Sequence, residues 1–167
     1  MKRFLALALP ALIAAPALAD IRVDFKEGAP VDRFTIINTG ACALTDATVT
    51  IDLDDSAGKL IFDVTGSGAG VDVFQPFRVI AGDTALSALP TVTDGDTAVS
   101  LGIRNLDPGQ RVAFTIDVDD TTSGYGIMVA GSEIDGAMIR VEAAGETAQG
   151  RFDTQSTARA VLSSCLS

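Results

Sequence analysis

The chain has no histidine and no tryptophan, and only one tyrosine and two cysteines among its 167 residues. Without histidine there is no Ser-His or Cys-His pair for nucleophilic catalysis and no imidazole ligand for zinc. The glycines at 66–70 precede another extended run and not a helix, so they form a turn and not a phosphate-binding loop. We therefore predict that the protein is not an enzyme. The one catalytic alternative is a hydrolase that works with carboxylates alone.

The first nineteen residues are typical of an export signal. Lys2 and Arg3 precede an apolar run at 4–14, and Ala17-Leu18-Ala19 matches the small-x-small pattern of a cleavage site. The apolar run is too short to span a membrane as a helix. We expect a signal peptide over residues 1–19 with cleavage after Ala19, and a single domain over 20–167. The protein is thus predicted to be secreted or periplasmic.

Positive charge is also scarce, with 12 basic residues against 22 acidic ones and a net charge of −10. Such a charge repels nucleic acid and anionic membranes, so we expect neither as a partner. The two cysteines, Cys42 and Cys165, form an even pair in a chain predicted to be exported, which favours one disulfide. Two unpaired thiols are the alternative.

Short alternating runs recur along the chain. Val112, Phe114, Ile116 and Val118 alternate with polar or small residues over Arg111–Asp119, which puts the apolar set on one face of a strand. About ten such strands are separated by turn residues, which is typical of a sandwich or barrel. We predict an all-β fold, an antiparallel β-sandwich that is immunoglobulin-like in the broad sense. The other expected strands are Ile21–Phe25, Arg33–Ile37, Thr48–Asp54, Leu60–Val64, Val71–Ile80 with an edge or bulge at Pro76, Ala98–Ile103, Ile127–Val129, Ala137–Val141, Ala148–Phe152 and Ala158–Leu162. Thr84–Leu89 is expected to be one helical turn or a loop.

Acidic residues gather where the strand at Arg111–Asp119 ends. Asp117 and Asp119 lie two residues apart and project from one face of the strand, some 6–7 Å apart. A bridging cation would remove their repulsion, and calcium prefers six to eight oxygen ligands. The candidate calcium ligands are Asp117, Asp119, Asp120 and Glu133. The alternative is a solvated polar face that ends in a turn, with no cofactor required.

Several stretches together resemble the aggregation factor core family, named after the core protein of the sponge cell-aggregation factor. They are EGAPVDRF at Glu27–Phe34, NTGAC at Asn38–Cys42, LIFDVTGSGAGVDVFQPF at Leu60–Phe77, AFTIDVDDT at Ala113–Thr121 and GSEIDGA at Gly131–Ala137. The resemblance implies an extracellular β-rich module of an adhesion proteoglycan that assembles with calcium and carbohydrate. It implies no catalytic residues.

These observations predict a non-catalytic adhesion or recognition module, with calcium as the candidate cofactor. Its expected partners are itself, a cell-surface protein or a glycan. A periplasmic accessory domain that binds a protein partner through its sheet edges is the alternative from a different class.

Overall fold

The computed structural model describes residues 18–28, 31–70, 74–122 and 129–163. Within these ranges the chain forms strands and two short 3-10 turns. The strands are β1 Asp20–Lys26, β2 Asp32–Asn38, β3 Leu44–Asp52, β4 Ile61–Asp63, β5 Arg78–Ala81, β6 Leu86–Ala88, β7 Ala98–Leu106, β8 Arg111–Asp119, β9 Met138–Ala143, β10 Glu146–Arg151 and β11 Thr157–Val161; the turns are η1 Asp83–Ala85 and η2 Gly131–Ile134.

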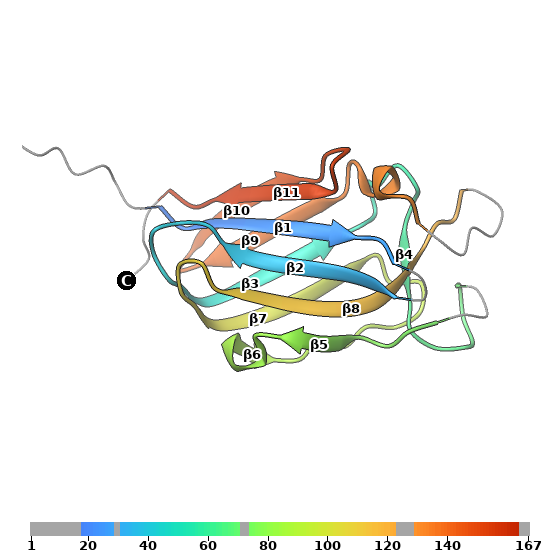
Figure 1. The fold of residues 1–167 in the computed structure, drawn as a ribbon, viewed down its shortest axis with the longest axis horizontal. Coiled ribbons are helices and arrows are strands. Elements are labelled where there is room, and N and C mark those ends of the chain that lie inside the picture. Colours follow the sequence, from blue (N-terminus) through green and yellow to red (C-terminus); the bar gives the residue numbers. More distant parts are fainter. Residues whose placement is uncertain (1–17, 29–30, 71–73, 123–128, 164–167) are drawn as a thin grey trace, which may run out of the picture.

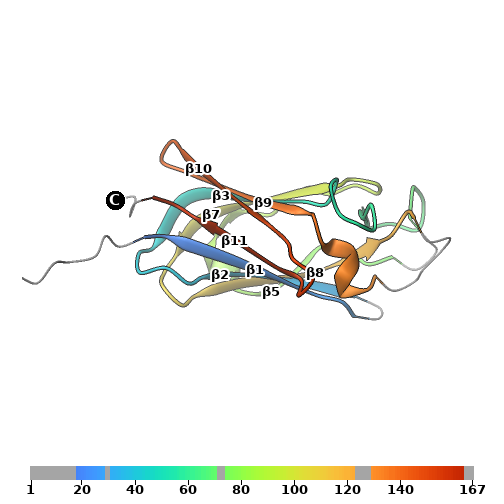
Figure 2. The same ribbon diagram turned by 90° about the horizontal axis from the view of Figure 1, so that it is seen from above.

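The strands form two packed layers, as Figure 2 shows from above. One sheet has the order β11-β1-β2-β8-β4, with β5 also paired to β8, and the other has the order β10-β9-β3-β7-β6. All pairings are antiparallel. The predicted all-β sandwich is therefore confirmed. Among the described residues, no helix is long and apolar enough to cross a membrane.

The core lies between the two layers and follows the alternation in the sequence. On β8, Val112, Phe114 and Ile116 are fully buried and Val118 is nearly so. Phe114 stacks on Phe34 of β2 with ring centroids 5.3 Å apart. The apolar residues that face the core on β8 are thus those that the sequence predicted. Burying each such side chain stabilises the fold by about 1.5–3 kcal/mol.

Some boundaries differ from the predicted ones. β3 begins at Leu44, four residues before the predicted start at Thr48, because Leu44 and Ala47 also face the core. Phe74–Phe77 is not a regular strand, and β5 begins only after Pro76 and pairs with β8 through an irregular register. η2 was not predicted. The expected strand Ile127–Val129 lies largely outside the described residues, as does the start of Val71–Ile80.

The stretch at Thr84–Leu89 is partly a helical turn, as predicted, and partly a strand. The 3-10 turn η1 ends at Ala85. Leu86 then begins β6, and the Leu86 side chain is buried against the core. A short turn followed directly by an extended residue carries the chain from one sheet to the other, because β5 pairs with β8 and β6 pairs with β7.

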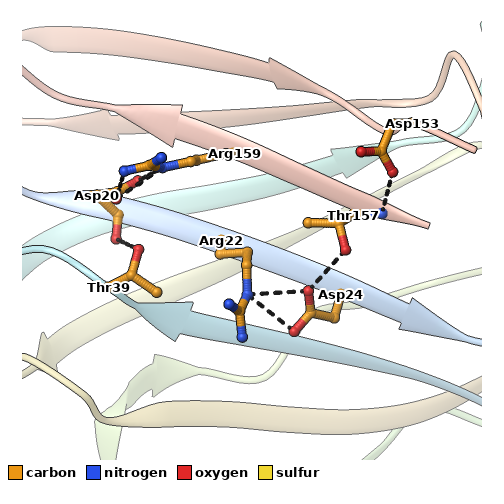
Figure 3. Close-up of polar contacts among 7 residues, drawn as sticks. All are labelled: Asp20, Arg22, Asp24, Thr39, Asp153, Thr157 and Arg159. Atoms are coloured by element: carbon orange, nitrogen blue, oxygen red, sulfur yellow. Dashed lines mark hydrogen bonds and ion pairs between the residues drawn. The ribbon is translucent and has the colours of Figure 1, made fainter. Parts of the chain in front are cut away.

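Polar side chains on β1 and β11 form a ladder on the outer face of the first sheet (Figure 3). Arg22 and Arg159 lie directly opposite each other, which brings like charges together. Each has an acidic partner: Arg159 Nε donates to Asp20 Oδ1 over 2.7 Å, and Arg22 Nε lies 3.2 Å from Asp24 Oδ1. Hydrogen bonds from Arg159 hold the pKa of Asp20 below its usual range.

The two sheets also approach each other at their edges. A Cβ placed on Gly150 of β10 would lie 2.1 Å from the carbonyl oxygen of Arg159 on β11. Only glycine fits so close to another backbone. The edges formed by β10 and β11 therefore abut, while the β5–η1–β6 segment crosses between the sheets on the other side of the sandwich.

The segment that holds Cys42 lies beside both ends of the described chain. The Ala41 N–H donates to the Leu18 carbonyl over 3.0 Å, and the Leu162 N–H donates to the Ala19 carbonyl over 2.9 Å. Cleavage after Ala19 would remove both acceptors, and it stays a prediction.

Cys165 lies outside the described residues. It follows Leu162 by three positions, and three extended steps of the chain span at most ~10–11 Å. The disulfide between Cys42 and Cys165 therefore stays a prediction, and the position of Leu162 supports it.

We expect the protein to carry a disulfide between Cys42 and Cys165. Mass analysis of denatured, unreduced protein should show no alkylated thiol, and reduction should lower the free energy of unfolding by roughly 2–4 kcal/mol because a long loop is released. Two alkylated thiols before reduction would rule the bond out. The Cys42→Ala variant is the control, since reduction should not change its stability.

Candidate metal centre

Three buried aspartates meet where β8 ends beside β4. Asp63 lies directly opposite Asp117 across the two strands, and Asp119 follows two residues later on the same face. One carboxylate oxygen from each of the three lies within 4.8 Å of the others. Figure 1 places β4 at the end of the sandwich opposite the start of β1.

These side chains lie on the outer face of their sheet and are nevertheless buried. Asp63 is 0%, Asp117 8% and Asp119 4% exposed. The irregular segment before β5 lies beside them: the Asp117 N–H donates to the Gln75 carbonyl over 3.2 Å, and the Gln75 N–H donates to the Asp63 carbonyl over 3.3 Å. This segment thus continues the pairing between β4 and β8.

A glycine-rich loop after β4 closes over Asp63. A Cβ on Gly70 would lie 2.1 Å from Asp63 Oδ2, so any larger residue at position 70 would displace the carboxylate. Asp94 fixes the start of this loop, because its Oδ1 accepts the N–H groups of Val64 and Thr65, each over 2.8 Å. The loop that the sequence marks as a turn therefore also places Gly70 against the acidic site.

A fourth carboxylate borders the group from β2. Asp32 Oδ2 accepts the Val118 N–H over 3.0 Å, and Asp32 Oδ1 accepts the Gly28 N–H over 3.0 Å. The Asp32 carboxylate therefore accepts a backbone N–H of β8 at the point where β2 begins, in place of a carbonyl from a neighbouring strand. Nothing in the alternation of the sequence singled out Asp32, since its role depends on the register between β2 and β8.

Burial and neighbouring charge both act on the protonation of this group. Burial, and then the negative charges of Asp119, Asp32 and Asp63, raise the pKa of Asp117 to about 7. Burial likewise raises the pKa of Asp32 to about 7, against the two backbone N–H groups that lower it. A carboxyl with such a pKa is partly protonated at neutral pH unless a cation offsets the repulsion.

The structure brings together only part of the predicted ligand set. Asp117 and Asp119 meet Asp63, which the sequence reasoning missed because it lies on a short strand far away in the chain. Asp120 Oδ1 accepts the Thr122 N–H over 3.1 Å, and Glu133 Oε2 accepts the Ala130 N–H at the start of η2. Neither Asp120 nor Glu133 belongs to the group of three.

The alternative of a solvated acidic face is wrong for Asp117 and Asp119. The outer face of β8 is exposed at Arg111 but buried at Asp117 and Asp119, and Gly70 lies against Asp63, which is paired with Asp117. A period of two separates the faces of a strand but cannot show that a second layer of chain covers the outer one.

The geometry suits one hard cation bound by oxygen. Calcium binds oxygens at 2.3–2.6 Å, so two oxygens on one ion lie at most about 4.6–5.2 Å apart. One oxygen from each of the three aspartates lies within 4.8 Å of the others, which is compatible with that limit. Their residue types match as well, since calcium and magnesium both prefer carboxylates while zinc prefers nitrogen and sulfur.

No protein-family model and no curated protein matches the chain. Solved structures similar to it include a family GH18 chitinase from Chromobacterium violaceum and an inactive mutant of a GH20 exo-β-N-acetylglucosaminidase from Vibrio harveyi. The first has a TM-score of 0.37 and 19% identity and covers 83% of this chain; the second has a TM-score of 0.35 and 14% identity and covers 80%. The chain spans 19% and 17% of the lengths of those two proteins.

The raised pKa values of Asp117 and Asp32 predict how the stability of the fold depends on pH when no cation is present. In chelator, the stability that the protonated forms of Asp117 and Asp32 contribute is fully present below the ordinary aspartate pKa of 3.8 and is lost as pH rises through about 7. Over that window the unfolded state loses its protons first, so the free energy of unfolding should fall by about 1.4 kcal/mol per pH unit for each group. Urea titrations between pH 4 and 8 would measure this slope.

The control for this slope is Asp117→Asn, which removes one titrating group. Its free energy of unfolding should depend less on pH than that of the unchanged protein over the same window. A slope identical in both proteins, or stability that rises with pH, would contradict the buried, coupled arrangement.

Proposed function

We propose that the protein is an exported, non-catalytic adhesion or recognition module that binds calcium at Asp63, Asp117 and Asp119. The observation that carries the proposal is the burial of three carboxylates with oxygens within 4.8 Å of one another. Asp32 lies close enough to raise the pKa of Asp117 and adds a fourth negative charge. A divalent cation would offset this repulsion, and carboxylates are ligands that calcium prefers.

The location of the site supports a binding function for it. The end of the sandwich that holds β4 also holds the end of β8, and loops at the end of a sandwich are where such domains usually carry function. A cation there would fix the Gly66–Gly70 loop to the end of β8 through Asp63. The resemblance to the aggregation factor core family implies the same function. The proposed partners are a second copy, a cell-surface protein or a glycan.

A carboxylate-based hydrolase is the second candidate, and the pKa of Asp117 is the observation that favours it. A carboxyl with a pKa of about 7 can act as a general acid at neutral pH. Saturable hydrolysis of a polysaccharide that Asp117→Asn abolishes would establish this candidate. A hydrolase of this kind loses activity when calcium occupies its acid, whereas the binding module gains stability.

Calcium should raise the melting temperature of the folded protein. If the dissociation constant is ~0.1 mM, 10 mM calcium adds about 2.7 kcal/mol, which shifts the melting temperature by roughly 5–10 °C for a domain of this size. Differential scanning calorimetry in chelator and in calcium measures the shift.

The matched variants are Asp119→Asn and Asp54→Asn, which change charge equally. Asp119→Asn should lose the calcium shift, because Asp119 belongs to the group of three. Asp54→Asn should keep it, because Asp54 is exposed and lies outside that group. Identical melting curves in chelator and calcium for the unchanged protein would contradict the calcium site.

Adhesion between copies is a separate expectation. Beads coated with the exported domain should clump in millimolar calcium, and clumping should fall at least severalfold when Asp117 and Asp119 are both replaced by Asn. The control carries Asp54→Asn and Asp83→Asn, two exposed positions. Turbidity would be measured over a calcium series; dispersed beads at every concentration, together with a normal calcium shift in melting, would exclude self-adhesion and leave a different partner.

A further inference from the structure

A hollow of about 500 Å³ lies on the outer face of the second sheet. Strands β3, β7, β9 and β10 and the residues after β3 form it, and its lining includes Thr50, Asp52, Asp55, Met138, Arg140 and Gln149. None of these residues belongs to the acidic group on the other sheet. The hollow is therefore not part of the proposed cation site.

Strand register places four polar side chains in one row across the sheet. Gln149 of β10 lies opposite Arg140 of β9, Arg140 lies opposite Thr50 of β3, and Thr50 lies opposite Ser100 of β7. Neighbouring strands are ~4.8 Å apart, close to the length of one sugar ring in an extended chain. The row thus presents hydrogen-bonding groups at a repeat that an oligosaccharide running across the strands can follow.

The two largest side chains of the row are available to a ligand. Among the described residues, neither Arg140 nor Gln149 makes a side-chain ion pair or hydrogen bond. Both are exposed, whereas the Thr50 and Ser100 hydroxyls bond each other over 2.8 Å. A guanidinium and an amide supply planar donors and one acceptor, which match pairs of adjacent hydroxyl groups.

The charge of the hollow and of the chain narrows the class of ligand. Asp52 and Asp55 lie near Arg140, so the lining has both signs and does not select a cation or an anion. The net charge of −10 repels acidic polymers over longer range. Half-buried Met138 adds an apolar contact for the face of a ring. A neutral, hydroxyl-rich chain meets all of these conditions.

We propose that this hollow binds a neutral oligosaccharide, which lies across β10, β9, β3 and β7 and bonds to Arg140 and Gln149. The inference rests on the proposed recognition function and selects a glycan among its proposed partners. It does not depend on the cation site, because the two sites use different sheets.

Affinity electrophoresis of the full folded chain tests the proposal. Native gels would contain one of four probes: glucomannan, xyloglucan, mixed-linkage β-glucan or, as an acidic comparison, polygalacturonate. We expect retardation in at least one neutral gel, both in chelator and in calcium. Binding that persists in chelator separates this site from the calcium proposal, which the melting temperature tests by itself.

The decisive variants are Arg140→Ala and Arg104→Ala. Both remove one exposed arginine from the second sheet, but only Arg140 lines the hollow. Arg140→Ala should weaken the association with the retarding polysaccharide at least tenfold, Gln149→Ala severalfold, and Arg104→Ala not at all. Unchanged melting temperatures would show that each variant folds.

Three outcomes would overturn the proposal. One is free migration in all three neutral gels; another is retardation by polygalacturonate alone. The third is an equal loss of retardation in Arg140→Ala and Arg104→Ala, which would assign binding to overall charge and not to the hollow.

Discussion

Repulsion among the carboxylates of Asp63, Asp117 and Asp119 constrains one whole end of the sandwich. Their removal from water is a consequence of chain topology: β4 and the segment around Gln75 both pair with the end of β8, and Gly70 closes over Asp63. An isolated buried charge costs several kcal/mol, so a group of this kind persists only when protons or a cation offset it. Protonation of these carboxylates, or a cation bound to them, therefore stabilises the covering loop and the end of β8 together.

The apolar face of β8 packs in the core, and its polar face carries two carboxylates of the proposed cation site. Its inward face supplies Phe114 to the aromatic cluster with Phe34, and this packing fixes the register with β2. That register in turn sets Asp32 beside Val118, where its carboxylate accepts a backbone N–H. The same pairing that builds the core thus determines which charges meet on the outside. Core packing and the proposed cation site are mechanically linked through one strand.

The sequence predicted the class of fold well because period-two alternation is a local property. Val112 to Val118 reveal their buried face within a few residues, and Gly and Pro mark the turns. It predicted Asp117 and Asp119 as a pair for the same reason. Asp63 and Asp32 could not be found this way, because they join the pair only through long-range strand pairing. The exposure of Asp117 was misjudged because alternation carries no information about a second layer of chain.

Roles for Asp120 and Glu133 were also beyond local reasoning. Both lie near the end of β8 or the turn η2, and both accept nearby backbone N–H groups. Aspartate and glutamate commonly take such roles at turns and at helix starts. Composition alone cannot divide acidic residues between local capping and a shared site. The pairing of strands far apart in the sequence determines which acidic residues share a site and which bond only to nearby backbone.

The abutting edges at Gly150 and Arg159 determine how copies of this protein can meet at high concentration. An open strand edge offers unpaired backbone groups on which another chain can add, and repeated addition leads to fibres. Here one pair of edges is occupied by its own neighbour, and the β5–η1–β6 crossing occupies much of the other side. Association is thereby directed to loops and sheet faces, where side chains and not backbone decide the partner. Such contacts are reversible and depend on side-chain complementarity, so copies of the chain stay dispersed unless matching surfaces meet.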